Sequence, residues 1–453
     1  MAFIENGRKY VLGFLCSKVV KYLLLISNPT LNFQVRDIMA LPLVLDKEKE
    51  AVVEPLVNDN IMISHADWDA FETSWDFDCH PMVKAHRENG GYKKAGVLQG
   101  RNPDLVQDCF IQWGTDCNLR FARLKANEEK LNHIFIDIYG LQDELTPEVE
   151  DRDVTVRRAD VQRDVRSLIS YAVGCMFGRY SLDSDGLILA GQKFSEKFVF
   201  AYVPYAGTGV SGNPGPRTAK SGCFLKVQEE WKSCDFWPVE DNIIPITDEN
   251  YLSEEDIVTR FCAWLTAAFG AGTLEQNLSF IADALGNTGR TPRETIRAYF
   301  LNDFFNDHCA TYSVTGSGKR PIYWLFDSGK QNGFKALIYI HRYDADTVGR
   351  LRVDYLHRMQ RIYASEMERM RDMEESSQDA REKASAAKRK EKLSRQLKEC
   401  REYDEKIGHL ALSRIALDLD DGVKANYRKL QTARDGKFYE VLANSKNIMS
   451  KGK

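Results

Sequence analysis

Apolar residues recur at helical spacing through most of the first 160 positions of the chain. Lys9–Leu24 places apolar side chains on one face and lysines on the other, which predicts an amphipathic helix. The helical pattern returns over residues 47–145, and Arg120–Tyr139 is its strongest amphipathic stretch. Between these regions Leu31–Val35 alternates apolar and polar residues, as a strand does. The pattern therefore predicts helices with one short strand. The buried core of this region is expected to include Trp75, Phe77 and Trp113.

The sequence pattern changes after residue 160 from mostly helical to mixed helix and strand. Val161–Phe177 predicts one more helix, and the glycine-, proline- and aromatic-rich stretch that follows holds short strands such as Phe198–Tyr205. Helical patterns return between residues 254 and 305, where Thr291-Pro292 is a typical helix start. Two apolar runs, residues 319–326 and 334–340, flank a turn that has glycine where a turn needs it. They predict a β-hairpin.

The last hundred residues are dominated by charge. A long charged helix with an imperfect apolar seam is predicted to run to about Ile407, and the weak seam at Glu374–Ala387 predicts the bend of an antiparallel helical pair. The expected fold class is therefore helix-rich α+β. We expect four regions, which are the end of a recognition domain (1–46), a helical spacer (47–160), a mixed α/β domain (161–345) and a long helical region with a C-terminal tail (346–453).

Composition narrows the classes of function. The net charge of -4 excludes a global cationic field, so any contact with nucleic acid must come from local patches. The ten cysteines include no Cys-x-x-Cys pair, and the nearest associations, Cys109 with Cys117 and Cys223 with Cys234, do not have zinc-site spacing. Lys18 and Lys21 interrupt the one apolar run near the start, which is also too short for a membrane span. We expect a cytoplasmic protein with free thiols.

Two stretches superficially resemble catalytic motifs. Tyr205–Gly209 follows a strand like a cofactor-binding glycine loop, but the prolines and glycines after it cannot start the required helix. Ser27–Thr30 lacks the second proline and the aromatic residue of an amino-methyltransferase loop. The isolated histidines, of which His80, His308 and His341 stand out, have no evident catalytic partners, so structural roles are expected. No bound cofactor and no catalytic residue are predicted for this chain.

A metal-dependent nuclease is a weaker alternative. Asp104, Glu128 and Lys130 have the loose spacing of acids that hold magnesium and a lysine that orients water. In such enzymes the acid-x-lysine pair lies on a strand, whereas here it falls within an amphipathic helix. The pattern favours an ordinary charged helix surface.

The predicted hairpin carries cations and amides beside its aromatic residues. Cations suit DNA phosphates, and glutamine or asparagine at a turn can contact base edges. The alternative is a hairpin whose aromatic residues are core and whose lysines are solvated. The residues predicted to bind DNA are Lys319, Arg320, Lys330, Gln331, Asn332, Lys335 and Arg342.

Several segments spread along the chain carry a family resemblance. They are Leu12–Lys18, Asn28–Val35, Trp68–Phe77, Ile134–Leu141, Ser170–Tyr180, Arg320–Lys330 and Asp418–Lys424. Together they resemble the C-terminal half of the PglX family, the adenine-specific DNA methyltransferases of BREX phage-defence systems. In that family an upstream domain binds S-adenosylmethionine and methylates adenine, and its glycine loop and Asn-Pro-Pro-Tyr motif have no counterpart here. One departure from the family is the loop Ala206–Thr218.

The resemblance implies a role without chemistry. The opening segment looks like the C-terminal end of a target-recognition domain, and helical spacers follow it. Its first helix has no evident partner element upstream, which indicates a truncation. The leading hypothesis is a DNA-recognition and scaffold portion, inactive alone, whose partners are double-stranded DNA and other BREX components. The alternative is a stand-alone interaction subunit that acts with a methyltransferase in trans.

Overall fold

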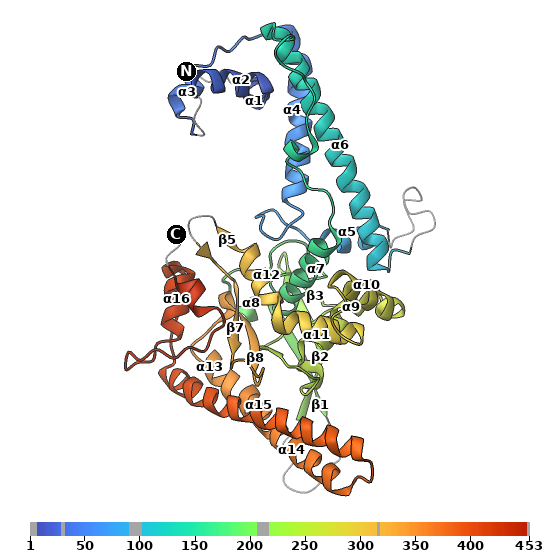
Figure 1. Ribbon diagram of the computed structural model, residues 1–453, viewed down its shortest axis with the longest axis vertical. Helices are drawn as coiled ribbons and strands as arrows, with labels where there is room; N and C mark the ends of the chain where they lie inside the picture. Colours follow the sequence, from blue (N-terminus) through green and yellow to red (C-terminus); the bar gives the residue numbers. More distant parts are fainter. Residues whose placement is uncertain (1–6, 29–31, 90–101, 206–216, 315–317, 451–453) are drawn as a thin grey trace. The chain divides into compact units, whose positions relative to one another are not determined.

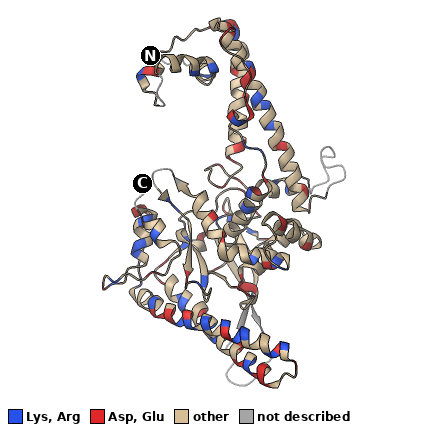
Figure 2. Ribbon diagram, in the orientation of Figure 1, with Lys and Arg blue, Asp and Glu red and all other residues tan. Residues whose placement is uncertain are grey.

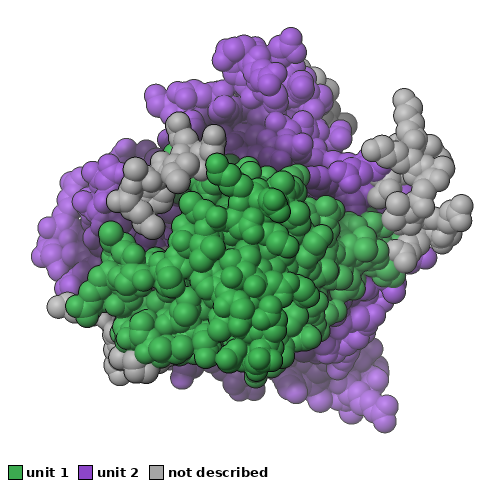
Figure 3. Space-filling view, turned by 90° about the horizontal axis from the view of Figure 1, so that it is seen from above, with its two compact units in different colours: residues 1–77, 108–160 green, residues 78–107, 161–453 purple. Residues whose placement is uncertain are grey.

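The chain forms two compact units, each built from two stretches of sequence. The computed structural model describes residues 7–28, 32–89, 102–205, 217–314 and 318–450 (Figure 1). Unit 1 comprises Met1–Phe77 and Asp108–Asp160, and unit 2 comprises Asp78–Gln107 and Val161–Lys453 (Figure 3). The predicted regions divide the chain differently, because residues 78–107, assigned to the spacer, belong to unit 2.

Unit 1 is helical. Its elements are α1 (Arg8–Leu15), α2 (Lys18–Ser27), α3 (Val35–Met39), α4 (Lys47–Trp68), most of α6 (Val106–Tyr139) and the short 3-10 helix η1 (Asp151–Asp153). The Asp46 carboxylate begins α4 by accepting hydrogen bonds from the Glu48 and Lys49 backbone N–H groups. Tyr10 and Phe14 of α1 pack on Phe135 of α6 in a buried apolar cluster. The long helices α4 and α6 lie side by side (Figure 1).

Three expectations for unit 1 are corrected. The predicted helix Lys9–Leu24 is two helices that break at Cys16 and Ser17. Of the predicted strand Leu31–Val35, Leu31 lies outside the described residues and Val35 begins α3, where the Gln34 N–H donates to the Asp37 carboxylate over 2.9 Å. This local cap outweighs the alternating pattern. Phe77 and Trp113 are buried as predicted, but Trp75 is 95% exposed.

Unit 2 contains small antiparallel sheets. One has the order β1 (Phe198–Tyr205), β2 (Arg217–Val227), β3 (Glu230–Ser233), a second has the order β4 (Ile244–Ile246), β8 (Lys335–Tyr339), β7 (Tyr323–Asp327), and a third pairs β5 (Ser313–Val314) with β6 (Gly318–Lys319). The predicted hairpin is confirmed, with Leu325 paired to Leu337. Because β4 pairs with its other side, β8 is a central strand and all five of its residues are buried. This explains its nearly continuous apolar sequence.

Helices pack around these sheets. They are α5 (Pro81–Asn89), α7 (Val161–Met176), α8 (Phe194–Lys197), η2 (Ser253–Glu255), α9 (Ile257–Phe269), η3 (Ala271–Thr273), α10 (Leu274–Ala284), α11 (Pro292–Asn302) and α12 (Phe304–Thr311). The Thr291 hydroxyl accepts from the Glu294 N–H at the start of α11, as the sequence predicted. The Asp256 carboxylate caps α9 and pairs in bidentate fashion with Arg297, at 2.6 and 2.9 Å. This ion pair, whose carboxylate is fully buried, joins α9 to α11.

The C-terminal region is confirmed as an antiparallel helical pair. After η4 (Ile340–Arg342), α13 (Thr347–Arg350) and a π-helical turn (Leu351–Leu356), α14 (His357–Ser376) and α15 (Ala380–Ser413) are joined by Ser377–Asp379. The break falls inside the predicted bend. Beyond α15 the chain folds as η6 (Leu419–Asp421), α16 (Gly422–Leu430) and α17 (Ser445–Met449). The fold is helix-rich α+β.

In the described part of the chain, no single helix is long and apolar enough to cross a membrane. Two sharply bent pairs, α1 with α2 and α9 with η3 and α10, reach that length and apolarity jointly.

Candidate nucleic-acid interface

The turn between β7 and β8 is held against α15. The Glu399 carboxylate accepts hydrogen bonds from the Ser328 hydroxyl at 2.7 Å, the Gln331 N–H at 2.8 Å and the Gly333 N–H at 3.0 Å. The Gln396 amide donates to the Gln331 carbonyl over 3.2 Å. A Cβ on Gly333 would lie 2.7 Å from the Gln396 carbonyl oxygen, so only glycine allows this close approach. The turn is therefore a packed element, and its backbone is bound within the protein.

Two of the predicted DNA-binding cations have partners inside unit 2. Lys335 is 8% exposed, and its ammonium donates to Asp327 at 3.0 Å and to the Leu301 carbonyl at 3.3 Å. Arg342 donates to three backbone carbonyls, and its guanidinium stacks 3.8 Å from the Phe194 ring centroid. Burial lowers the pKa of Arg342. Both side chains fasten elements of unit 2 together.

The other predicted residues are more accessible. The side chains of Arg320, Lys330 and Gln331 are exposed, while Lys319 and Asn332 are half-buried. Lys319 ends β6 and Arg320 follows it, whereas the remaining three lie in the β7–β8 turn. The structure thus separates the seven residues into two that are already paired and five that solvent reaches.

A second group of cations gathers at the C-terminal end of unit 2. We call the outer side chains of Arg414, Lys424, Arg428, Lys429 and Arg434 the C-terminal basic surface; all five are exposed. Figure 2 shows lysines and arginines along α16. A shallow hollow of about 640 Å³ has no acidic residue in its lining, which consists of Ser413, Arg414, Ile415, Ala416, Ala425, Arg428, Lys429, Thr432 and Arg434.

A neighbouring hollow extends this surface. It has a volume of about 560 Å³ and shares Ala425 and Arg428 with the first. Its other lining residues are Asp421, Lys424, Phe438 and Met449, and the Phe438 ring is 41% exposed. The two hollows therefore meet at the outer face of α16 and form one continuous surface.

The inner face of α16 fixes the position of these cations. Tyr427 is fully buried, and its ring lies 4.8 Å from that of Trp324 in β7. The buried Gln431 side-chain carbonyl accepts from the Val441 and Leu442 N–H groups and from the Ser445 hydroxyl, at 2.9 to 3.1 Å. One amide thus connects the end of α16 to the segment that leads into α17.

Few carboxylates neutralise the C-terminal basic surface. Arg414 pairs with Asp346 at 2.7 Å, and Lys429 lies 3.9 Å from Asp421. Within the described ranges, no carboxylate lies within 4 Å of the charged nitrogens of Lys424, Arg428 or Arg434. Arg428 and Arg434 therefore present guanidinium groups without a carboxylate partner to an external anion. Lys424, whose ammonium also donates to the Ser450 carbonyl at 2.6 Å, adds a third positive charge.

Sequence reasoning missed this surface. Lys424 and Arg428 stand four residues apart on the side of α16 opposite Tyr427 and Leu430, which is the signal of an amphipathic basic helix. The acidic run that contains Asp418, Asp420 and Asp421 directly precedes this helix and balances its charge in any average over the segment.

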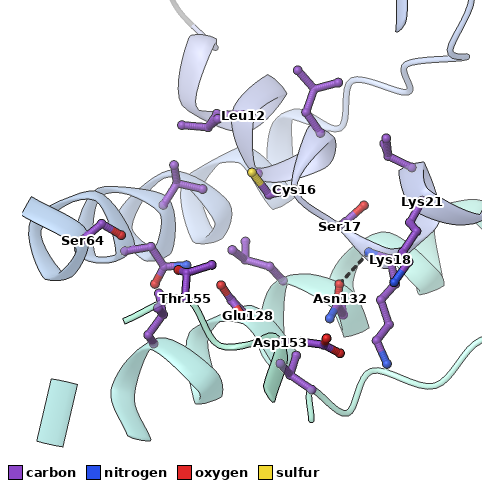
Figure 4. A pocket seen from close by; sticks show the side chains of 18 of the residues that line it. Leu12, Cys16, Ser17, Lys18, Lys21, Ser64, Glu128, Asn132, Asp153 and Thr155 are labelled. Carbon is purple, nitrogen blue, oxygen red and sulfur yellow. Dashed lines mark hydrogen bonds between the residues drawn. The ribbon is translucent and has the colours of Figure 1, made fainter. Parts of the chain in front are cut away.

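Unit 1 contains a cavity of about 720 Å³ between α1, α2, α4 and α6 (Figure 4). Its walls are largely apolar, and the Lys18 N–H donates to Asn132 at its edge over 2.9 Å. Burial, with the nearby Glu128 carboxylate, raises the pKa of the Cys16 thiol. Burial also raises the pKa of Glu128. A thiol with a raised pKa is a poorer nucleophile at neutral pH than an ordinary cysteine.

The singled-out histidines have structural surroundings. His308 is buried, and its Nε2 accepts the Ile322 and Tyr323 N–H groups, both at 3.0 Å. His80 accepts the Met82 N–H at 3.3 Å, and burial lowers the pKa of each of these two histidines to about 3. Burial also lowers the pKa of His341. His80 and His308 are therefore neutral. The first accepts a backbone hydrogen bond at the start of α5, and the second accepts two at the start of β7.

The remaining motif residues do not form a catalytic cluster in the described structure. Glu128 and Lys130 lie on α6 and not on a strand, while Asp104 is in the other unit, 3.0 Å from His86. Among the described residues no group of three or more histidine, cysteine, aspartate or glutamate side chains could hold a metal ion. Of the glycine-loop candidate, only Tyr205 is described, as the last residue of β1.

Comparison with known proteins gives related sequences. No family model matches the chain. Over 424 residues, 93% of the chain, it is 39% identical to the adenine-specific methyltransferase PglX of Lacticaseibacillus casei (strain Zhang). In an alignment 477 positions long that covers 98% of the chain, it is 30% identical to the adenine-specific methyltransferase BrxX of Escherichia coli O9:H4 (strain HS). The chain is related to adenine-specific methyltransferases.

The similarity to PglX and BrxX covers nearly all of this chain but only part of those proteins. The chain spans 31% of PglX and 34% of BrxX, or about a third of each. The relationship supports the family that the sequence segments indicated.

Proposed function

We propose that the chain is the C-terminal, DNA-recognition and scaffold portion of an adenine-specific DNA methyltransferase that acts in BREX phage defence. The observation that carries this proposal is similarity over 93% and 98% of the chain to about a third of two adenine-specific methyltransferases. Under this proposal, S-adenosylmethionine binding and methyl transfer belong to other parts of the full-length enzyme. The partners of this portion are double-stranded DNA and other BREX components.

The scaffold role is supported by the long helices of unit 1. Helix α6 has 34 residues, so it extends over about 50 Å at the usual rise per residue. It lies beside the 22-residue α4, and Arg123 and Asn127 of α6 both donate to Asp59 of α4. Such a braced helix pair keeps its length in solution and can therefore set a spacing along DNA.

The recognition role is assigned to the accessible part of the hairpin region. Arg320 and Lys330 supply cations for phosphates, and Gln331 supplies an amide that can donate to and accept from a base edge. Lys335 and Arg342 contribute indirectly, because their intramolecular contacts hold β7, β8 and the segments beside them.

The test measures binding of the purified chain to a labelled DNA duplex by fluorescence anisotropy, at a series of salt concentrations. Arg320→Ala with Lys330→Ala is expected to weaken binding and to lower the slope of log affinity against log salt by about 2. The matched control is Lys383→Ala with Lys388→Ala, which removes two equally exposed cations from α15. A chain that does not bind duplex DNA even at low salt would contradict the proposal.

A further inference from the structure

We propose that the C-terminal basic surface is a second DNA contact, which binds backbone phosphates of the duplex without regard to sequence. This inference rests on the proposed function, because that function supplies DNA as the ligand. It adds a site formed by the end of α15, the outer face of α16 and the turn after it, none of which belongs to the predicted hairpin region.

The charge distribution supports an anionic ligand. The larger hollow is lined by four cationic side chains and no carboxylate. Arg428 lies at the centre, because it lines both hollows, and it has no carboxylate within 4 Å among the residues described. Unneutralised cations that share a concave surface attract phosphates more strongly than the same charges scattered on a convex one.

The surface is also preorganised. The Arg434 Nε donates to the Ser413 carbonyl at 3.0 Å, and its backbone N–H donates to the Ser413 hydroxyl at 3.2 Å. The first bond holds the side chain and the second holds the backbone, while the terminal guanidinium nitrogens have no partner within the described ranges. A fixed guanidinium loses little entropy on binding and presents a planar pair of donors, which matches two phosphate oxygens.

The shape of the surface suits a DNA backbone and not a base pocket. Both hollows are shallow and open, and neither is lined by an asparagine or glutamine side chain. Contacts from arginine and lysine to phosphates position a protein on DNA but carry no sequence information. The exposed Phe438 ring beside Lys424 and Arg428 offers an apolar surface for the deoxyribose of the same strand.

The test removes the outer cations of α16 with Lys424→Ala, Arg428→Ala and Lys429→Ala together. Alanine preserves the helix, and none of the three side chains is part of the buried face. The slope of log affinity against log salt is expected to fall by about 2 to 3. Affinity at low salt is expected to fall about tenfold or more, equally for a natural and a scrambled duplex. Circular dichroism checks that the fold is retained.

The matched control is Lys383→Ala, Lys388→Ala and Arg401→Ala, which removes three exposed cations from α15 and so changes the net charge equally. Equal loss of affinity in both triple variants would mean that only the overall charge matters, and would overturn the inference. Binding of poly-glutamate that is lost in the α16 variant, with DNA binding unchanged, would assign the surface to an acidic protein and also overturn it.

The two proposals fail in different ways. If the α16 variant binds DNA normally while Arg320→Ala with Lys330→Ala weakens binding, the inference is wrong and the proposed function stands. If the unaltered chain binds no duplex DNA at low salt, the proposed function and the inference both fail.

Discussion

The hairpin region and the C-terminal basic surface are both rich in cations, but the structure uses those cations differently. At the hairpin, Lys335 and Arg342 bind a carboxylate and backbone carbonyls of the same unit. On α16, Lys424 and Arg428 project outward and Arg428 has no acidic neighbour within 4 Å in the part of the chain described. Whether a cation can bind a ligand therefore depends on its partners inside the protein, and not on its presence in a cluster of cations.

The difference follows from the cost of burial. A charged group that leaves water must regain its hydrogen bonds inside the protein, and a strand in the middle of a sheet offers only internal partners. Helix α16 lies at the edge of unit 2 and buries one face only, so its outer cations stay hydrated. Substitutions should therefore change stability at the hairpin and ligand binding on α16.

Arg342→Ala should give the largest effect on stability. It removes three hydrogen bonds to backbone carbonyls and the stacking on Phe194, at a cost of about 3 to 4 kcal/mol in the free energy of unfolding. Differential scanning calorimetry should show a transition several degrees lower. Lys330→Ala, an exposed cation of the same region, should leave the transition unchanged. An unaltered midpoint for Arg342→Ala would show that this cation is free for a ligand.

Gln431→Leu should have the next largest effect, and a local one. It keeps the side-chain volume but leaves the Val441 and Leu442 N–H groups without their acceptor, which costs about 2 to 3 kcal/mol. Hydrogen exchange should accelerate at residues 431–450, and DNA binding through the C-terminal basic surface should weaken with it. Gln378→Leu is the control, because that glutamine is exposed in the connection between α14 and α15. Uniform acceleration across unit 2 would contradict a local role.

Acidification from pH 7 to pH 5 should lower the free energy of unfolding by about 2 kcal/mol through the buried His308. Burial lowers the pKa of His308 to about 3, from about 6.5 in an unfolded chain, so the folded state binds fewer protons. The stability that this neutral imidazole contributes is complete above pH 6.5 and is lost as the pH falls toward 3. Between pH 7 and pH 5 the loss is about 2 kcal/mol.

His308→Gln should remove this contribution of about 2 kcal/mol, which thermal melts at pH 5 and pH 7 would measure. The buried His80, whose pKa is also lowered to about 3, should leave a similar pH dependence in the variant. Identical pH dependence in the variant and the unaltered chain would show that His308 is not the group responsible.

Local pattern was enough to predict the elements whose partners are close in sequence. The β7–β8 hairpin and the α14–α15 pair each join neighbours through a short turn, so periodicity and turn residues specify them. The addition of β4 to β8 was not predicted, because Ile244 and Leu337 are distant in sequence and three residues carry little pattern. The exposure of Trp75 likewise depends on packing that composition does not report.

The site was harder to predict than the fold. A run of cations around the hairpin is visible in the sequence, but the acceptors of Lys335 and Arg342 come from positions such as Asp327, Phe177 and Val239, which only the folded chain brings near. The C-terminal basic surface depends on Gln431 and on the contact of Tyr427 with Trp324. Neither contact has a signature in sequence spacing.

The two units are interleaved along the chain, which limits how recombination between related genes can exchange them. Unit 1 is completed by Asp108–Asp160 only after the chain has passed through Asp78–Gln107 of unit 2. A single recombination crossover at any point before residue 161 therefore gives at least one unit with two parents. Exchanging a whole unit between relatives requires crossovers at all three borders, near residues 77, 107 and 160. We therefore expect both sequence stretches of unit 1, with the long helices that they contain, to be inherited from the same parent.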